Sequence, residues 1–159
     1  EDNIYDLTLL FGPMYHLKTQ DEKLKAFSEA RRVTKNGGHI FAAYVMNDYS
    51  VITYCFKQNK IKECVARNSL TEDFHSIPTD DDLYCYLRLE DINELNEKSG
   101  LVREKIIAAD GAADYIRREL NALDEESFAW FIKYHLANCE RPELLGASSH
   151  VVDILRNEK

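Results

Sequence analysis

The segment Asp6-Leu7-Thr8-Leu9-Leu10-Phe11-Gly12-Pro13-Met14-Tyr15-His16-Leu17 decides the fold of this chain. Its first half is a nearly continuous apolar run, which is typical of a buried strand that is covered on both faces. The Gly12-Pro13 pair then ends the strand, because glycine and proline both favour turns. We therefore expect a strand from Ile4 to Phe11, followed by a tight turn.

A helix is expected directly after this turn. Thr19 and Glu22 have the spacing of a capping box, in which a hydroxyl and a carboxylate each bind a free backbone N–H. Apolar residues recur at helical spacing to about Thr34, and the Gly37-Gly38 pair offers a left-handed cap where the helix ends. The buried stripe of this helix is predicted at Leu24, Phe27, Ala30 and Val33.

Residues His39 to Val45 form a second apolar run that is typical of a buried strand. Strand, helix, glycines and strand follow one another as a βαβ unit. Such a unit implies two parallel strands joined by a right-handed crossover, so the fold class is α/β.

The remaining elements are predicted with weaker patterns, within a single domain that spans residues 1–159. Residues 51–82 are expected to form an excursion of helix and loop, with Ser50 as the helix cap. His135 falls on the apolar face of a late helix and is expected to lie in the core. The later elements are a strand-like piece at 83–87, a helix at 91–98 closed by Gly100, a strand at 101–109, helical pattern at 112–123, a helix at 125–138 after Asp124, and a strand at 150–155.

Composition excludes several classes of function. The net charge of −8 argues against nonspecific nucleic-acid binding, which needs basic clusters. No apolar run approaches the roughly 20 residues that a membrane span needs, and no signal segment opens the chain. None of the four cysteines belongs to a C-x-x-C pair, so no metal site is expected. Reduced, half-buried thiols are typical of a cytoplasmic protein.

The first forty-five residues resemble one block of the class I S-adenosylmethionine-dependent methyltransferases. The segment Asp6–Leu17, the amphipathic helix, its ending Arg32-Val33-Thr34-Lys35-Asn36-Gly37-Gly38 and the following strand all match the family pattern. Gly100-Leu101-Val102 and residues 146–150 are similar to the entries of the last two family strands. The resemblance implies a partial Rossmann-like methyltransferase sheet, namely strands four to seven with flanking helices and one antiparallel strand.

The family binds its cofactor through a Gly-rich loop and an acidic residue that come before this block, and this sequence contains neither. Gly37-Gly38 does not replace the loop, because it follows a helix and precedes a strand, the reverse of the order that cradles a cofactor. The resemblance thus implies that the chain is a truncated C-terminal part of a methyltransferase. We expect this part alone to be inactive and to bind no S-adenosylmethionine.

The resemblance places the site at the end of the first strand. Phe11, Gly12 and Pro13 are the expected cofactor-binding residues, with Gly12 allowing close approach of the backbone. Tyr15 and His16 are the candidate catalytic residues, which would position the acceptor and, at His16, take its proton. Packing of this pair against the following helix is an equally open alternative.

Three further residues are candidates for contact with the methyl acceptor: Tyr44, Asn47 and His150. Packing in the core or in a loop is as good an interpretation for Tyr44 and Asn47. For His150, a structural hydrogen bond is the favoured alternative.

The function expected from the resemblance is methyl transfer to a small-molecule or unknown acceptor by the full-length protein. The alternative is a non-enzymatic binding or dimerisation domain derived from the same fold. Without the preceding family strands, residues 4–11 would form an exposed apolar edge, and such an edge seeks a pairing partner. We therefore expect a homodimer through this strand.

Overall fold

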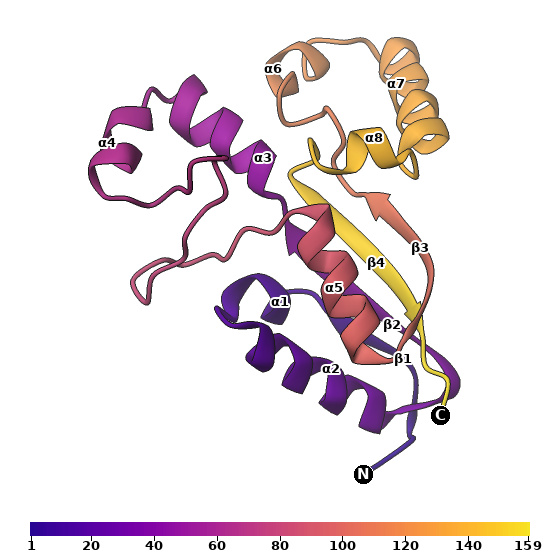
Figure 1. Cartoon of the computed structure of the whole chain (residues 1–159). Coiled ribbons are helices and arrows are strands. Elements are labelled where there is room, and N and C mark those ends of the chain that lie inside the picture. Colours follow the sequence, from indigo (N-terminus) through magenta and orange to yellow (C-terminus); the bar gives the residue numbers. More distant parts are fainter.

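The computed structural model describes all 159 residues, and they fold around one four-stranded sheet (Figure 1). The order across the sheet is β1-β2-β4-β3. The pair β1 and β2 is parallel, whereas β4 runs antiparallel to both of its neighbours. The last strand is thus inserted, reversed, between two strands that run the same way. The strands are β1 (Tyr5–Leu10), β2 (Thr34–Val45), β3 (Val102–Ala108) and β4 (His150–Arg156).

The helices connect these strands, and the two ends of the chain lie close together at one end of the sheet (Figure 1). None of the helices combines the length and the apolar character needed to cross a bilayer. The helices are α1 (Pro13–His16), α2 (Gln20–Val33), α3 (Asn47–Ser50), the π-helix η1 (Val51–Lys57), α4 (Ile61–Ala66), α5 (Leu89–Ser99), α6 (Arg117–Leu120), α7 (Glu125–Asn138) and α8 (Pro142–Leu145).

The main core lies between the sheet and the packed pair of helices α2 and α5. Alternate residues of β2 enter this core, since successive side chains of a strand point to opposite faces. The predicted capping box is confirmed: the N–H of Glu22 donates to Thr19 Oγ1 at 3.2 Å, and the carboxylate accepts from the N–H of Thr19 at 2.9 Å. The fully buried core residues include Phe27, Ala30, Ile40, Ala42, Ile92, Leu95, Val151 and Leu155.

The predicted stripe of α2 is correct at its centre and incomplete at its ends. Phe27 and Ala30 are buried, whereas Leu24 and Val33 are only half-buried. A charged residue, Lys23, occupies the first buried position of the helix instead. Hydrophobic periodicity did not predict it.

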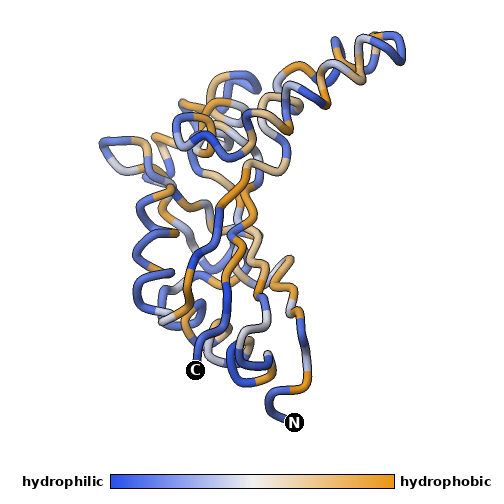
Figure 2. The backbone as a smooth tube through the Cα atoms, turned by 90° about the vertical axis from the view of Figure 1, so that its right-hand side faces the viewer, coloured by the Kyte–Doolittle hydropathy of each residue, from blue (hydrophilic) through white to orange (hydrophobic).

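The apolar run of β1 is not covered on both faces as its pattern suggests, whereas the exposed apolar edge expected for residues 4–11 is confirmed. The strand pairs only with β2 and lies at the edge of the sheet. Tyr5, Leu7 and Leu9 are each about half exposed, and Figure 2 shows hydrophobic residues along the segment that follows the N-terminus. An apolar run reports the tendency of a strand to be buried, but an edge position leaves one side of it open.

Gly37 and Gly38 do not cap the helix as expected. Strand β2 already begins at Thr34, and Gly37 has a φ of 79° within an irregular start of this strand, where its register with β1 shifts. At Gly38 a Cβ would lie 2.8 Å from Thr34 Cγ2 and 2.9 Å from the carbonyl oxygen of Asp6. The two glycines therefore allow an irregular strand entry and a close approach of β1.

Residues 51–82 leave the sheet at the carboxyl end of β2, and Figure 1 shows η1 and α4 extending away from the sheet. The helix here begins at Asn47 with Met46 at its N-cap, so the predicted cap at Ser50 is wrong. The strand-like piece at 83–87 makes a single bridge, between Leu87 and Met46, and forms no strand.

The second half of the chain follows the predicted order with two corrections. Gly100 ends α5 at a φ of 68°, and Asp124 caps α7 by accepting the N–H of Ser127 at 2.8 Å, both as predicted. However, residues 112–123 are helical only in α6. No residue of α7 is buried, so the placement of His135 in the core is wrong. It is half-buried beside Gly111, whereas most apolar side chains of this helix are exposed.

Candidate functional site

The chain turns sharply where β1 ends. Gly12 has a φ of 136° and a ψ of −61°, a conformation that glycine adopts without steric cost. No atom lies within 4 Å of the point that a Cβ on Gly12 would occupy. Pro13 opens α1, a position where its missing N–H is not needed, and Phe11 is about half exposed. These three residues form an open rim at the carboxyl end of β1.

A cluster of aromatic and imidazole rings surrounds this rim. The ring centroid of Tyr15 lies 4.9 Å from that of His16, 5.9 Å from Tyr84 and 6.4 Å from His150. The cluster joins three parts of the chain: α1, the 83–87 segment and the start of β4. They meet because β4 runs antiparallel, so that its first residue lies at the edge where the parallel strands end. The structure thus brings together Tyr15, His16 and His150, all predicted from sequence, and adds Tyr84.

His16 is held by the 83–87 segment. Its Nδ1 lies 2.9 Å from the carbonyl oxygen of Leu83, and because a carbonyl can only accept, Nδ1 carries the proton. In the neutral ring, Nε2 then bears the free lone pair. The N–H of Cys85 donates to the carbonyl of Tyr15 at 2.8 Å, which ties the same segment to α1. The ring of His16 is therefore oriented with Nε2 able to accept a proton.

His150 is held by a carboxylate that sequence reasoning missed. Its Nδ1 lies 2.7 Å from Asp110 Oδ2, and its backbone N–H donates to the same oxygen at 2.9 Å. Ser149 Oγ lies 3.1 Å from the same Nδ1. A carboxylate at Nδ1 leaves Nε2 as the acceptor in the neutral ring, the arrangement used by general-base histidines. No local pattern links Asp110 with His150, so no sequence signal could have paired them.

Tyr44 lies in the interior rather than at the rim. It is fully buried, and its hydroxyl has no hydrogen-bond partner. Burial raises the pKa of Tyr44 far above its usual range, and the nearby negative charge of Asp153 adds to this effect. This position favours the packing role that the sequence left open.

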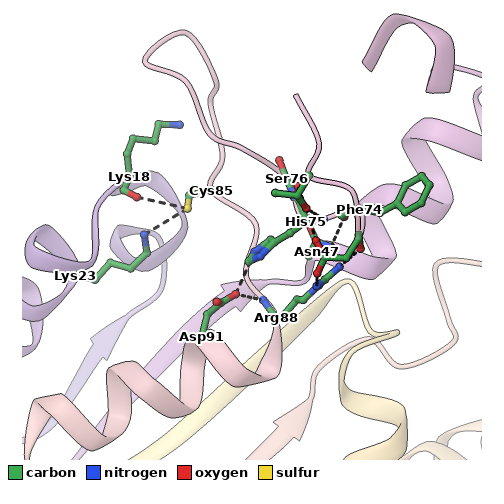
Figure 3. A network of polar contacts seen from close by, with 11 residues as sticks. Lys18, Lys23, Asn47, Phe74, His75, Ser76, Cys85, Arg88 and Asp91 are labelled. Carbon is green, nitrogen blue, oxygen red and sulfur yellow. Dashed lines mark hydrogen bonds and ion pairs between the residues drawn. The ribbon is translucent and has the colours of Figure 1, made fainter. Parts of the chain in front are cut away.

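The side chain of Asn47 holds residues 74–76 of the excursion through hydrogen bonds to their backbone, as Figure 3 shows. Its Nδ2 donates to the carbonyl of Phe74 at 3.0 Å, and its Oδ1 accepts the N–H of Ser76 at 2.9 Å. The side chain is fully buried and both of its polar atoms are engaged. Loop packing, the second interpretation of Asn47, is therefore favoured over contact with an acceptor.

Metal-ligating side chains do not gather anywhere in the chain: no three His, Cys, Asp or Glu residues are placed so that they could hold an ion together. All four cysteines are free thiols.

No protein-family model matches the chain, and no curated protein matches its sequence. Solved structures do resemble it. A S-adenosylmethionine-dependent methyltransferase from Methanosarcina mazei aligns with 99% of this chain and 61% of its own length, with a TM-score of 0.54 and 8% identity. Phosphoethanolamine N-methyltransferase 2 from Haemonchus contortus, solved with S-adenosylmethionine, aligns with 100% of this chain and 34% of its own, with a TM-score of 0.46 and 14% identity. Geranyl diphosphate C-methyltransferase from Streptomyces coelicolor aligns with 99% of this chain and 48% of its own length, with a TM-score of 0.48 and 12% identity.

The chain has the fold of part of a S-adenosylmethionine-dependent methyltransferase, and it spans about three fifths of the Methanosarcina mazei protein. Only this similarity has a TM-score above 0.5 among the three, so the fold rests on it and on the strand order. The partial Rossmann-like sheet expected from the sequence is thereby confirmed, including its one antiparallel strand.

Proposed function

We propose that the protein containing this chain transfers a methyl group from S-adenosylmethionine to a small-molecule acceptor. The observation that carries this proposal is the meeting of Tyr15, His16 and His150 beside the open rim at Gly12. Ligands of open α/β sheets bind outside the carboxyl ends of the parallel strands, and this is where the cluster lies. The similarity of the fold to a methyltransferase supports the same interpretation, by analogy alone.

The rim formed by Phe11, Gly12 and Pro13 suits one side of a cofactor site. The backbone at Gly12 is open, so a ligand could approach it more closely than it could approach a residue with a side chain. S-adenosylmethionine, when bound, supplies an electrophilic methyl group, and the protein supplies alignment and the exclusion of water. Because the rim makes up only one side, we expect this chain alone to bind the cofactor weakly or not at all.

Two histidines can take a proton from the acceptor. An imidazolium at His150 would lie against the carboxylate of Asp110, whereas one at His16 would lie against the neutral carbonyl of Leu83. We therefore extend the catalytic set of His16 and Tyr15 to His150, with Asp110 as its positioning residue. Tyr15 touches both imidazoles and would orient the acceptor between them.

The test is a transfer assay with radiolabelled S-adenosylmethionine and a set of small amines, phenols and carboxylic acids. It is run on this chain and on any longer gene product that contains it. Transfer that is lost in both His16→Gln and His150→Gln supports the proposal. If no protein containing this chain binds S-adenosylmethionine in a calorimetric titration, the proposal is wrong. The alternative, a non-enzymatic binding or dimerisation domain, is not favoured by any contact in the site.

A further inference from the structure

A buried lysine lies behind the candidate site. Lys23 is 2% exposed, and Asp153 is the only other charged side chain that is buried. Asp153 is neutralised by Arg103, whose guanidinium binds both of its oxygens at 2.7 and 2.6 Å. No carboxylate lies within ion-pair distance of Lys23 Nζ. Lys23 is thus the one buried charge in this chain without a counter-charge.

The protein partners of Lys23 are both uncharged groups. Its Nζ donates to the carbonyl of Leu17 at 2.6 Å and approaches Cys85 Sγ at 3.4 Å. An ammonium has three N–H donors, so one of them has no acceptor in the protein. Removing a cation from water without a counter-charge is energetically unfavourable. The position of Lys23 therefore calls for an anion that the protein itself does not supply.

A hollow of about 210 Å³ lies directly beside Lys23, between the start of α2, residues 75–87 and the start of α5. Figure 3 shows Lys23 and Cys85 on one side of this region and the pair of His75 and Asp91 on the other. The lysine thus faces a space large enough for a small organic molecule.

We propose that this hollow binds a small monocarboxylate, whose charge neutralises Lys23. Two acidic residues also line the hollow: Asp91, which lies 3.2 Å from His75 Nε2, and Glu94, which lies 2.6 Å from Lys98 Nζ. Each has one basic partner, and Lys18 adds a second cation to the lining, so a single added negative charge meets little repulsion. A phosphate or sulfate, with a second negative charge, would face both carboxylates and is disfavoured.

The hollow is separate from the ring cluster but shares one structural element with it. The 83–87 segment contributes Tyr84 to the cluster and Cys85, Tyr86 and Leu87 to the hollow. The same segment holds His16 through the carbonyl of Leu83. A bound carboxylate would therefore brace the segment that orients His16. The proposal does not depend on methyl transfer, and either can fail alone.

The test uses butyrate as the probe and the amide NMR spectrum of the 159-residue chain as the readout. Sodium butyrate is titrated against sodium chloride at equal ionic strength. We expect saturable shifts at the amides of Cys85 and Ser76 in the wild type. They should persist in Lys25→Met, which removes an exposed lysine of the same helix, and disappear in Lys23→Met.

Two results would overturn the proposal: no saturable shift in the wild type, or the same shifts in Lys23→Met. An equal response to sulfate would overturn the choice of a monocarboxylate. Should Lys23→Met fail to fold, a measurement on the wild type decides. Nuclear Overhauser contacts between butyrate and the methyl groups of Leu95, which lines the hollow, are expected, and their absence at saturating butyrate contradicts the proposal.

Discussion

Asp110 binds His150 twice, although 40 positions separate them: one carboxylate oxygen lies 2.7 Å from the ring Nδ1 and accepts the backbone N–H at 2.9 Å. Strands β3 and β4 are antiparallel, so the two residues that follow β3, Ala109 and Asp110, meet His150, the first residue of β4. The carboxylate therefore fixes the backbone entry of β4 and the ring orientation together. This contact gives the proposed site its best-defined proton acceptor.

Asp110→Asn should lower the rate of methyl transfer about 10- to 100-fold, because the amide can rotate to favour the wrong ring tautomer and carries no charge. The measurement is kcat in the transfer assay, with the far-ultraviolet circular dichroism spectrum as a check of folding. The matched control is Asp2→Asn. Asp2 precedes the first residue of β1, at the end of the strand that lies away from the site, so this variant should leave kcat unchanged. Equal activity of both variants would remove Asp110 from the mechanism.

His16→Asn and His16→Ala should separate the chemical role of the ring from its structural role. Asparagine can still donate to the carbonyl of Leu83 but has no Nε2, whereas alanine removes both groups. We expect both variants to lose transfer activity. Only His16→Ala should also speed hydrogen exchange at the amide of Cys85, measured by NMR. Full activity of His16→Asn would contradict the catalytic assignment.

Thr19→Ala should destabilise the chain by about 1 kcal/mol, since the N-cap hydroxyl of α2 is lost. Chemical denaturation followed by circular dichroism measures this, and Thr19→Ser, which keeps the hydroxyl, should remain close to the wild type. If Thr19→Ala were as stable as the wild type, the capping box would contribute nothing measurable.

The pKa of Glu22 is lowered because the backbone N–H and the hydroxyl of Thr19 donate to its carboxylate. A lowered folded-state pKa means that this contribution is present above the ordinary carboxyl range and is lost as the pH falls through the lowered value. The free energy of unfolding should therefore fall less steeply with decreasing pH in Glu22→Gln than in the wild type. Identical slopes between pH 5 and pH 2, roughly, would contradict this expectation.

Cys55 should react slowly with iodoacetamide in the folded chain. Burial raises the pKa of its thiol to about 11, with a smaller contribution from Cys64, whose sulfur lies 3.6 Å away. At pH 8 roughly a thousandth of this thiol is the reactive thiolate. Cys139 is only half-buried and should be modified first, as mass spectrometry of peptides would show. Equal rates at all sites would mean that the buried cysteines are open to solvent.

Strand β1 should mediate a homodimer, because its apolar side chains are exposed at a sheet edge. Light scattering should give twice the chain mass for the wild type and the chain mass for Leu9→Lys. Val65→Lys, at an exposed apolar position of α4, is the control and should remain dimeric. A monomeric wild type would rule out this interface.

The sequence by itself determined the elements whose signals are local. The apolar run before Gly12, the capping pair of Thr19 and Glu22, the cap at Asp124 and the stop at Gly100 all act over a few residues. The backbone responds to these neighbours wherever the element lies in the fold. The resemblance, carried by contiguous motifs, likewise indicated one antiparallel strand and placed Tyr15 and His16 in the turn after the first strand.

Only the tertiary structure decided which side chains are covered and which meet. Charged Lys23 is buried because it packs against the distant 83–87 segment, where Cys85 Sγ lies 3.4 Å from its Nζ. Asp110 and His150 meet because two antiparallel strands bring them together. Burial and pairing depend on residues that are distant in the chain, and no local pattern contains that information.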